Sequence, residues 1–261
     1  MFRDLWRYRQ FVINSVRNEL ICRFARSKFG GLWMIINPLV QVAIYALILS
    51  NILAARLPGI DNQFSYAIYL MAGLLAWTLF NEVVSRCLNL FIEQANVMKK
   101  MSFPRITLPA IVIGSSLLNN IFLFLAMICI FAFLGHRFSM AMLWLLPLTL
   151  IILAFATGIG LILGVINVFI RDVGQVVPIV LQMWFWFTPI VYPVSIVPQS
   201  FQYWLGFNPI YSLTSAYQDV LLYGVSPQVE SLLGVFITAI VVMVFSLLLF
   251  RRASAELVDV L

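Results

Sequence analysis

Long apolar runs separated by short polar stretches make up most of the chain. A helix that crosses a bilayer needs about 20 mostly apolar residues, and five stretches meet this requirement directly. A sixth is shorter and rich in aromatic residues but still qualifies. Apolar and polar positions do not alternate as the strands of a membrane barrel require. The pattern predicts an all-α integral membrane protein with six transmembrane helices, at residues 33–55, 64–85, 106–134, 141–169, 174–192 and 230–250.

The composition agrees with this pattern. Of the 261 residues, 63% are hydrophobic and only 10% are charged, and the mean hydropathy is +1.01. Soluble domains contain about 45–50% apolar and about 25% charged residues. A soluble fold of this size could not bury so much apolar surface. The composition therefore excludes an ordinary soluble enzyme and a disordered chain.

The positive charges are distributed unevenly along the chain. The sequence has 16 Lys and Arg against 10 Asp and Glu. All the basic residues except Arg56 and Arg137 fall in four segments, at 1–32, 86–105, 170–173 and 251–261. Cytoplasmic loops carry the excess of Lys and Arg in membrane proteins. We therefore expect both termini in the cytoplasm, and we expect membrane lipids rather than nucleic acid as the partner of these charges.

Residues 1–32 are predicted to form an amphipathic helix in the cytoplasmic interface, ahead of a transmembrane domain at 33–261. The charged start lacks the apolar stretch of a cleaved signal. On a helical wheel one arc is apolar, with Leu5, Val12, Ile13, Val16, Leu20 and Phe24. The expected interface residues are Arg3, Arg7 and Arg17. Such a helix is either a simple anchor with orienting charge or a moving part that contacts headgroups or a partner.

The predicted cytoplasmic loop at 91–109 has an apolar face of its own. The residues that form it are Phe91, Ile92, Ala95, Val97, Met98 and Met101, and two lysines, Lys99 and Lys100, lie among them. Pro104 and Pro109 then redirect the chain. The pattern is typical of a short helix that inserts into a groove of another protein. A basic loop that only fixes the topology is the alternative.

The segment 193–229 is too apolar for a solvated loop. It contains no Lys or Arg, carries many aromatic residues, and is interrupted midway by Asn208-Pro209. Two short helices that re-enter the outer leaflet fit this pattern, provided that protein or water covers their ends. A lid on the membrane surface is the alternative.

Residues for catalysis are scarce. The single histidine, His136, lies in a short loop, and Cys22, Cys87 and Cys129 have no metal-binding spacing. No Gly-x-Ser-x-Gly motif and no phosphate-binding Gly-x-x-x-x-Gly-Lys-Ser/Thr loop are present. We therefore expect no catalytic residue, no metal ligand and no cofactor in this chain.

Three local patterns predict packing rather than chemistry. The glycines Gly158, Gly160 and Gly164 indicate close helix packing. Glu82 is expected to pair with Arg86 four residues later. Asp172, in the turn that begins at Phe169, is expected to cap the next helix.

Aromatic residues make up 15% of the chain. Most of them are explained by core packing and by belts at the membrane interfaces. An aromatic wall would also let the apolar face of a sugar ring stack without binding it deeply. The candidates for such a channel or gate are Trp77, Phe80, Trp184, Trp186, Tyr192, Tyr203, Trp204, Tyr211 and Tyr217.

Several motifs, in order along almost the whole chain, resemble a known family. Gly31-Leu32-Trp33 and Asn37-Pro38-Leu39 open the first span after the amphipathic helix. Lys99 and Lys100, then Ser102-Phe103-Pro104-Arg105, follow in the inner loop. Phe169 with Arg171-Asp172 and Asn208-Pro209 with Tyr211 complete the set. Together they resemble the membrane subunit of type 2 ABC exporters for polysaccharides, in the branch for O-antigen, capsule and teichoic acid, most of all the O-antigen permease.

The resemblance implies a homodimer in the bacterial inner membrane, bound to two separate ATP-binding cassette subunits that hold ATP and Mg²⁺. A lipid-linked polysaccharide would cross through a channel between the two protomers. The loop at 91–105 would hold a helix that couples to the ATPase, with Met98, Lys99, Lys100, Met101, Ser102, Phe103, Pro104 and Arg105. The segment 193–229 would form an outer gate.

Other functions remain as alternatives. A permease of the same type for a drug or a small lipid is one, and the long aromatic outer segment counts against it. An intramembrane enzyme that acts on lipid headgroups is another. It would need clustered Asp, His or Arg residues, and the chain offers too few.

Overall fold

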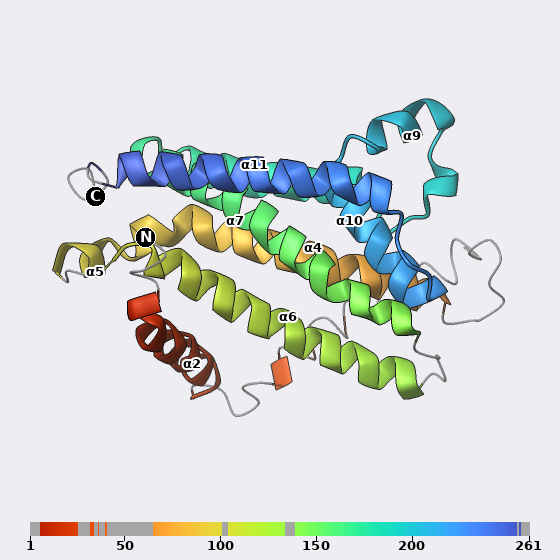
Figure 1. The fold of residues 1–261 in the computed structure, drawn as a ribbon, viewed down its shortest axis with the longest axis horizontal. Helices are drawn as coiled ribbons and strands as arrows, with labels where there is room; N and C mark the ends of the chain where they lie inside the picture. Colours follow the sequence, from red (N-terminus) through yellow and green to blue (C-terminus); the bar gives the residue numbers. More distant parts are fainter. Residues whose placement is uncertain are drawn as a thin grey trace.

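Four long apolar helices form the body of the protein (Figure 1). The computed structural model describes residues 6–25, 32–33, 36, 40, 65–100, 104–133, 139–254 and 256, and within these ranges it contains no β-strand. The long helices are α4 (Ser65–Glu93), α6 (Thr107–Phe133), α7 (Leu145–Phe169) and α11 (Val229–Ala253). A 3₁₀ turn, η1 (Met140–Trp144), leads into α7. Each of the four is long and apolar enough to cross a membrane.

Helix α4 lies at the centre of this bundle. It packs against α6 and α7, and α7 packs in turn against α11. Most of α4 is buried, whereas α11 exposes large apolar side chains such as Phe236, Val241 and Phe245 along its length. A helix that is apolar all round is either a core helix or a lipid-facing one. In this bundle α4 is a core helix, whereas α11 leaves much of its apolar surface uncovered within the single chain.

Glycines let α7 approach its two neighbours closely, as the sequence predicts. A Cβ atom added at Gly160 would lie 2.6 Å from the Cβ atom of Cys87 on α4. One added at Gly158 would lie 3.0 Å from the backbone nitrogen of Met243 on α11. Helix α7 therefore contacts backbone or Cβ atoms on two sides, which is the packing that small residues permit in membranes.

The predicted spans at 64–85, 106–134, 141–169 and 230–250 are confirmed as helices, and α4 continues to Glu93. The predicted span at 33–55 lies almost wholly outside the described residues. The predicted span at 174–192 forms a shorter helix, α8 (Val173–Phe187), of 15 residues. It ends early because Pro189 disfavours a helical Thr188, which is extended at φ −97° and ψ 123°. Six full-length spans are therefore not observed among the described residues.

A short stretch of turns continues the path of α8. Near the start of α8, Asn167 donates a hydrogen bond of 3.0 Å to the carbonyl oxygen of Leu88 on α4. Beyond α8, the hydroxyl of Tyr66 donates to the carbonyl oxygen of Val191. Leu88 and Tyr66 are separated by about 33 Å of helix. Helix α8 and residues 188–191 together therefore run along nearly the full length of α4.

The turn before α8 differs from the prediction in one detail. Asp172 occupies the N-cap position, but its side chain makes no capping hydrogen bond. Its backbone is already helical, at φ −62° and ψ −26°. Its carbonyl oxygen accepts from the amides of Gln175 and Val176 instead. The prediction of a side-chain cap at Asp172 is therefore wrong.

Two short helices precede the last span, as predicted. They are α9 (Gln199–Leu205) and α10 (Pro209–Gln218), after a 3₁₀ turn, η2 (Val194–Ile196). Pro209 starts α10, and the Asn208 side chain accepts from the amide of Ile210 at 3.1 Å. Helix α10 packs among α4, α7 and α11, whereas α9 projects beyond the long helices (Figure 1). Whether either helix enters the outer leaflet stays a prediction.

The N-terminal segment forms α2 (Arg9–Ala25), which lies against α6 (Figure 1). Val16 is buried in this contact, and Val12 and Leu20 are partly buried on the same face. Ile13, placed on the apolar arc from the sequence, is 61% exposed. Leu5 and the side chain of Phe24 lie outside the described residues. Helix α2 is therefore a packed element, with one stripe directed at α6.

Candidate functional site

The features of functional interest lie at the two ends of the bundle (Figure 1). At one end, here named the α5 end, lie α5 (Ala95–Lys100), α2 and the C-terminal end of α11. At the other, the α9 end, lie α9, the residues after α8 and the start of α4. The segments at the α5 end carry most of the basic residues, and α9 with the turn after it carries a group of exposed aromatic residues that includes Tyr203, Trp204 and Phe207.

Helix α5 follows α4 with only Gln94 between them. The amide of Met98 donates to the carbonyl oxygen of Gln94 at 2.9 Å, and the Met98 side chain is buried. Lys99 is exposed. Pro104 and Arg105 are half-buried at the start of α6, where Pro104 accepts from the Thr107 hydroxyl at 2.8 Å. The predicted coupling residues Met101, Ser102 and Phe103, and the side chain of Lys100, lie outside the described residues.

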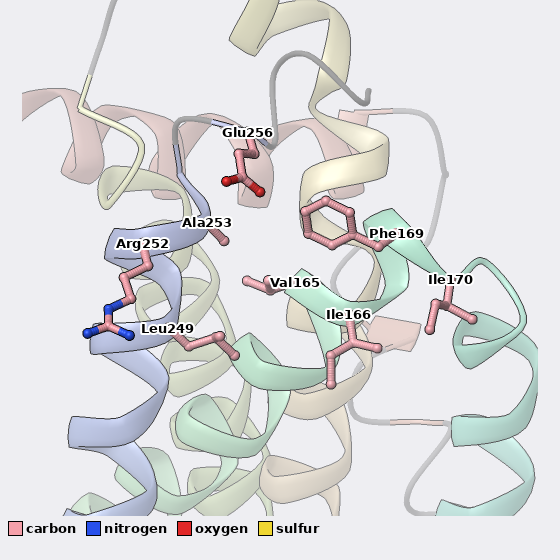
Figure 2. A pocket seen from close by; sticks show the side chains of 8 residues that line it. All are labelled: Val165, Ile166, Phe169, Ile170, Leu249, Arg252, Ala253 and Glu256. Atoms are coloured by element: carbon pink, nitrogen blue, oxygen red, sulfur yellow. The ribbon is translucent and has the colours of Figure 1, made fainter.

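An open groove of about 420 Å³ lies between α7 and α11 at the α5 end. Figure 2 shows an apolar floor from Val165, Ile166 and Leu249, with the ring of Phe169 beside it. The carboxylate of Glu256 faces this space, and the guanidinium of Arg252 turns away from the other lining residues. The groove is therefore apolar with charge only at its rim.

A cluster of charged and polar side chains joins three helices near the α5 end. Arg86 on α4 donates to both carboxylate oxygens of Glu19 on α2, at 2.7 and 2.9 Å. It also donates to the hydroxyl of Ser115 on α6 at 2.7 Å, and it lies 3.5 Å from Glu82, as the four-residue spacing predicts. Asn119 on α6 donates to Glu82 at 2.7 Å. One guanidinium therefore bridges α2, α4 and α6.

Burial gives this cluster its significance. The side chain of Arg86 is 23% exposed, and those of Glu19 and Glu82 are each 28% exposed. Charges that are partly shielded from water are costly unless they are paired and hydrogen-bonded, as these are. The sequence predicts the pair of Glu82 and Arg86, but it does not predict the part of Glu19. The only feature in the sequence that points to Glu19 is its position, as a lone carboxylate beside Val16 and Leu20 on the apolar face of α2.

Three of the predicted channel aromatics are buried within the chain. Phe80 is fully buried and contacts the rings of Trp77 and Trp184 at 5.6 and 5.3 Å between centroids. Trp77 is buried against Phe185. Tyr217 is buried on α10, and its hydroxyl lies 2.6 Å from that of Thr149. Trp77, Phe80 and Tyr217 are therefore packing residues of the single chain.

The other predicted aromatics reach the surface. Trp186 is exposed, and the half-buried Tyr192 donates to its carbonyl oxygen at 2.7 Å. On α9, Tyr203 and Trp204 are 70% and 69% exposed and contact each other and Phe207, with ring centroids 5.4 to 6.1 Å apart. The structure therefore brings these candidates together as two pairs, one half-exposed and one fully exposed.

Two further candidates, Trp184 and Tyr211, are half-buried. The indole nitrogen of Trp184 donates to the Asn208 side chain at 3.0 Å, and Asn208 donates to the Thr188 hydroxyl at 3.1 Å. These bonds fasten the junction of α9 and α10 to the end of α8.

One acidic residue near the α9 end was not singled out from the sequence. Asp219 opens a π-helical turn, η3 (Asp219–Tyr223), after α10. The turn ends at Gly224, whose φ of 65° is a left-handed conformation that glycine adopts easily. Burial raises the pKa of the Asp219 carboxyl above its ordinary value. The sequence carries no signal for this turn because π-helical geometry depends on packing.

The described residues contain no cluster of three His, Cys, Asp or Glu side chains that could hold a metal ion. The geometry is instead that of a membrane bundle with a short helix at one end and exposed aromatic rings at the other. Residues 9–222 match the family model for the ABC-2 type transporter. The chain therefore belongs to the ABC-2 type transporter family, and with its apolar helices it is a multi-pass transport subunit of the bacterial inner membrane.

Curated relatives match along nearly the whole chain. An O-antigen export system permease protein RfbA of Klebsiella pneumoniae is 28% identical over 247 residues, covering 93% of this chain and 92% of the relative. Its namesake in Myxococcus xanthus is 26% identical over 99% of this chain and 98% of the relative. The polysialic acid transport protein KpsM of Escherichia coli is 22% identical over 89% of each chain. The resemblance to type 2 ABC permeases is confirmed.

Proposed function

We propose that this chain is the membrane subunit of an ATP-driven exporter that moves a lipid-linked polysaccharide, most similar to O-antigen, across the bacterial inner membrane. The observation that carries this proposal is the similarity to O-antigen permeases over 93% to 99% of the chain. Helix α5 and the exposed aromatic residues of α9 support it, since they supply a contact for an ATPase and a surface for sugar rings.

ATP and Mg²⁺ are bound by two separate ATP-binding cassette subunits in this proposal. The chain has no phosphate-binding loop of its own. The segment 91–105 couples to the ATPase, with α5 as its helical part. Met98 fixes α5 to the bundle, and Lys99 is presented outward. Replacing Lys100 or Phe103 should then uncouple ATP use from export in a folded protein, and normal export by these variants would contradict the docking role.

Two copies of the chain form the channel in this proposal, with both termini in the cytoplasm and the α9 end outside. Trp186, Tyr203 and Trp204 offer exposed ring faces to the glycan. Aromatic faces bind the C–H faces of sugars with little specificity for position, so a long chain can slide. Trp77 packs against Phe185, whose ring contacts that of Trp186.

Capsule export is a second candidate, favoured by the match to the polysialic acid transport protein. The two candidates differ in the lipid at the end of the glycan. A polyprenyl diphosphate indicates O-antigen, and a phospholipid indicates capsule.

The test is the location and end-group chemistry of surface polysaccharide in cells that lack this chain. Glycan trapped inside and still joined to its lipid is the expected result, with recovery when the wild-type chain is restored. Unchanged surface glycan would overturn the proposal and would favour a permease for a small substrate.

A further inference from the structure

The Arg86 cluster has no part in the proposed substrate path, yet it is the most connected polar group in the described part of the chain. Its guanidinium nitrogens divide their bonds between helices. Nη2 donates to both oxygens of Glu19 on α2, and Nη1 donates to Ser115 on α6. The two terminal nitrogens of one planar guanidinium therefore reach α2 and α6 at the same time, which the single nitrogen of lysine cannot reproduce. The geometry is therefore specific to one orientation of α2.

Stability alone does not account for such a cluster. Partly buried ion pairs often add no more stability than apolar side chains of similar volume. They do fix one geometry and exclude others, because a lost partner leaves a charge unpaired in a poorly solvated place. The cluster is therefore better suited to fixing the position of α2 than to strengthening the fold.

The position of Arg86 along α4 links it to α5. Arg86 lies about 13 Å of helix before Ala95, where α5 begins. Only Gln94 separates the two helices, and the amides of Val97 and Met98 both donate to its carbonyl oxygen. A force applied to α5 by a bound ATPase therefore reaches Arg86 through a nearly continuous helix.

We propose that Arg86 is a positioning residue that fastens the interface helix α2 to α4 and α6, so that α2 moves as one unit with the coupling helix α5. This proposal rests on the proposed docking of an ATPase at α5. Val16 supports it, because it is buried on the same face of α2 as Glu19 and touches α6 at Gly114. The ion pair and the apolar contact together hold α2 in place.

The first test measures ATP hydrolysis and export by the full transporter, this chain with its ATPase, in membrane vesicles. Arg86→Gln should keep ATP hydrolysis within about twofold of wild type and lower export about tenfold, within the range of coupling between sites. Export by Arg86→Lys should lie between that of wild type and that of Arg86→Gln, since lysine keeps the charge but has only one nitrogen. Arg251→Gln, at an exposed cation of α11, is the matched control and should match wild type.

The second test replaces the ion pair with a covalent bond. A Cβ atom at position 114 would lie 3.0 Å from a methyl carbon of Val16, so cysteines at 16 and 114 are close enough for a disulfide. In a background without the three native cysteines, we expect this disulfide to leave export unchanged and to restore export to the Arg86→Gln variant. Loss of export on cross-linking, or failure to restore it, would overturn the proposal.

The rate of cross-linking separates this proposal from the proposed function. Disulfide formation between positions 16 and 114 needs no glycan. Arg86→Gln should lower its rate severalfold, because α2 is no longer held against α6. An unchanged rate would overturn the role of Arg86 even if the transporter exports polysaccharide. A lowered rate in a transporter that moves no polysaccharide would leave the role of Arg86 standing and overturn the proposed function.

Discussion

The two ends of the bundle are held together by different kinds of interaction. At the α5 end, one charged side chain, Arg86, joins three helices through charge-assisted hydrogen bonds. At the α9 end, neutral groups make the connections, as when the Tyr69 hydroxyl donates to the carbonyl oxygen of Pro189 at 3.1 Å. Ion pairs fix one orientation, whereas isolated neutral bonds tolerate adjustment. In the proposed exporter, the α5 end would therefore transmit movement and the α9 end would adjust to the passing glycan.

The largest effect is expected where α4 and α7 meet, because this is the most extensive contact between helices in the described part of the chain. Gly160→Ala places a Cβ atom 2.6 Å from that of Cys87, so two helix backbones have to separate. Overpacking of this kind costs about 1–3 kcal/mol, occasionally more. Thermal unfolding in detergent should show a melting temperature lowered by several degrees.

Gly234→Ala is the control for this variant, because no atom lies within 4 Å of its added Cβ. It should leave the melting temperature unchanged or slightly raised. Equal melting temperatures for the two variants would show that α4 and α7 are not in the close contact described.

A smaller effect is expected at the junction of α9 and α10. Asn208→Ala removes the cap of α10 and the bonds to Trp184 and Thr188. Loss of an N-cap costs about 1 kcal/mol. The variant should unfold at a lower temperature, and protease should cut near residue 208 sooner than in wild type. Ser200→Ala, at an exposed position on α9, is the control, and equal protection of the two variants would contradict the role of Asn208.

Asp219 should give a weaker effect that depends on pH. Because burial raises the pKa of this carboxyl in the folded protein, the unfolded chain releases its proton at a lower pH than the folded one. Folding stability therefore falls as the pH rises past the ordinary pKa, and the loss is complete above the raised pKa. Asp219→Asn should raise the melting temperature at about pH 8 and leave it unchanged well below the ordinary pKa. A gain of equal size at both pH values would contradict this assignment.

The smallest effect on folding is expected on α9. Tyr203→Ala and Trp204→Ala remove exposed rings, so the melting temperature should change by less than the effects above. Export should fall, because the proposed sugar surface is lost, and Trp204→Phe should retain most of it. Normal export by both alanine variants would show that the exposed rings of α9 do not bind the glycan.

The sequence predicts the long helices well because their apolar runs have the length that a bilayer demands. It also contains the signals for the α10 cap at Asn208 and for the close packing at Gly160, since both are local. Pro189 is a signal for the end of α8. The apolar residues continue beyond it, however, so the apolar run alone predicts a longer helix. Asp172 shows the opposite case, where a suitable residue type takes a helical conformation and leaves its side chain unused.

The candidate site was less predictable because it depends on contacts between distant segments. The pair of Glu82 and Arg86 follows from helical spacing, but the bond from Arg86 to Glu19 joins positions 67 residues apart. The burial of Trp77 and Phe80 likewise depends on the neighbours that α4 acquires. Periodicity identifies an apolar face, but it does not say whether lipid, a channel or another helix covers that face.

The close contacts of α7 limit how the protein can change shape. With Gly158 against the backbone of α11 and Gly160 against α4, the three helices lack the layer of side chains over which packed helices slide. Shear between them is therefore blocked, and hinge motion is the remaining way for large displacements to occur. In the proposed exporter, movement begun at α5 would rotate these three helices as one rigid body, and a small displacement at the α5 end would become a larger displacement at the α9 end.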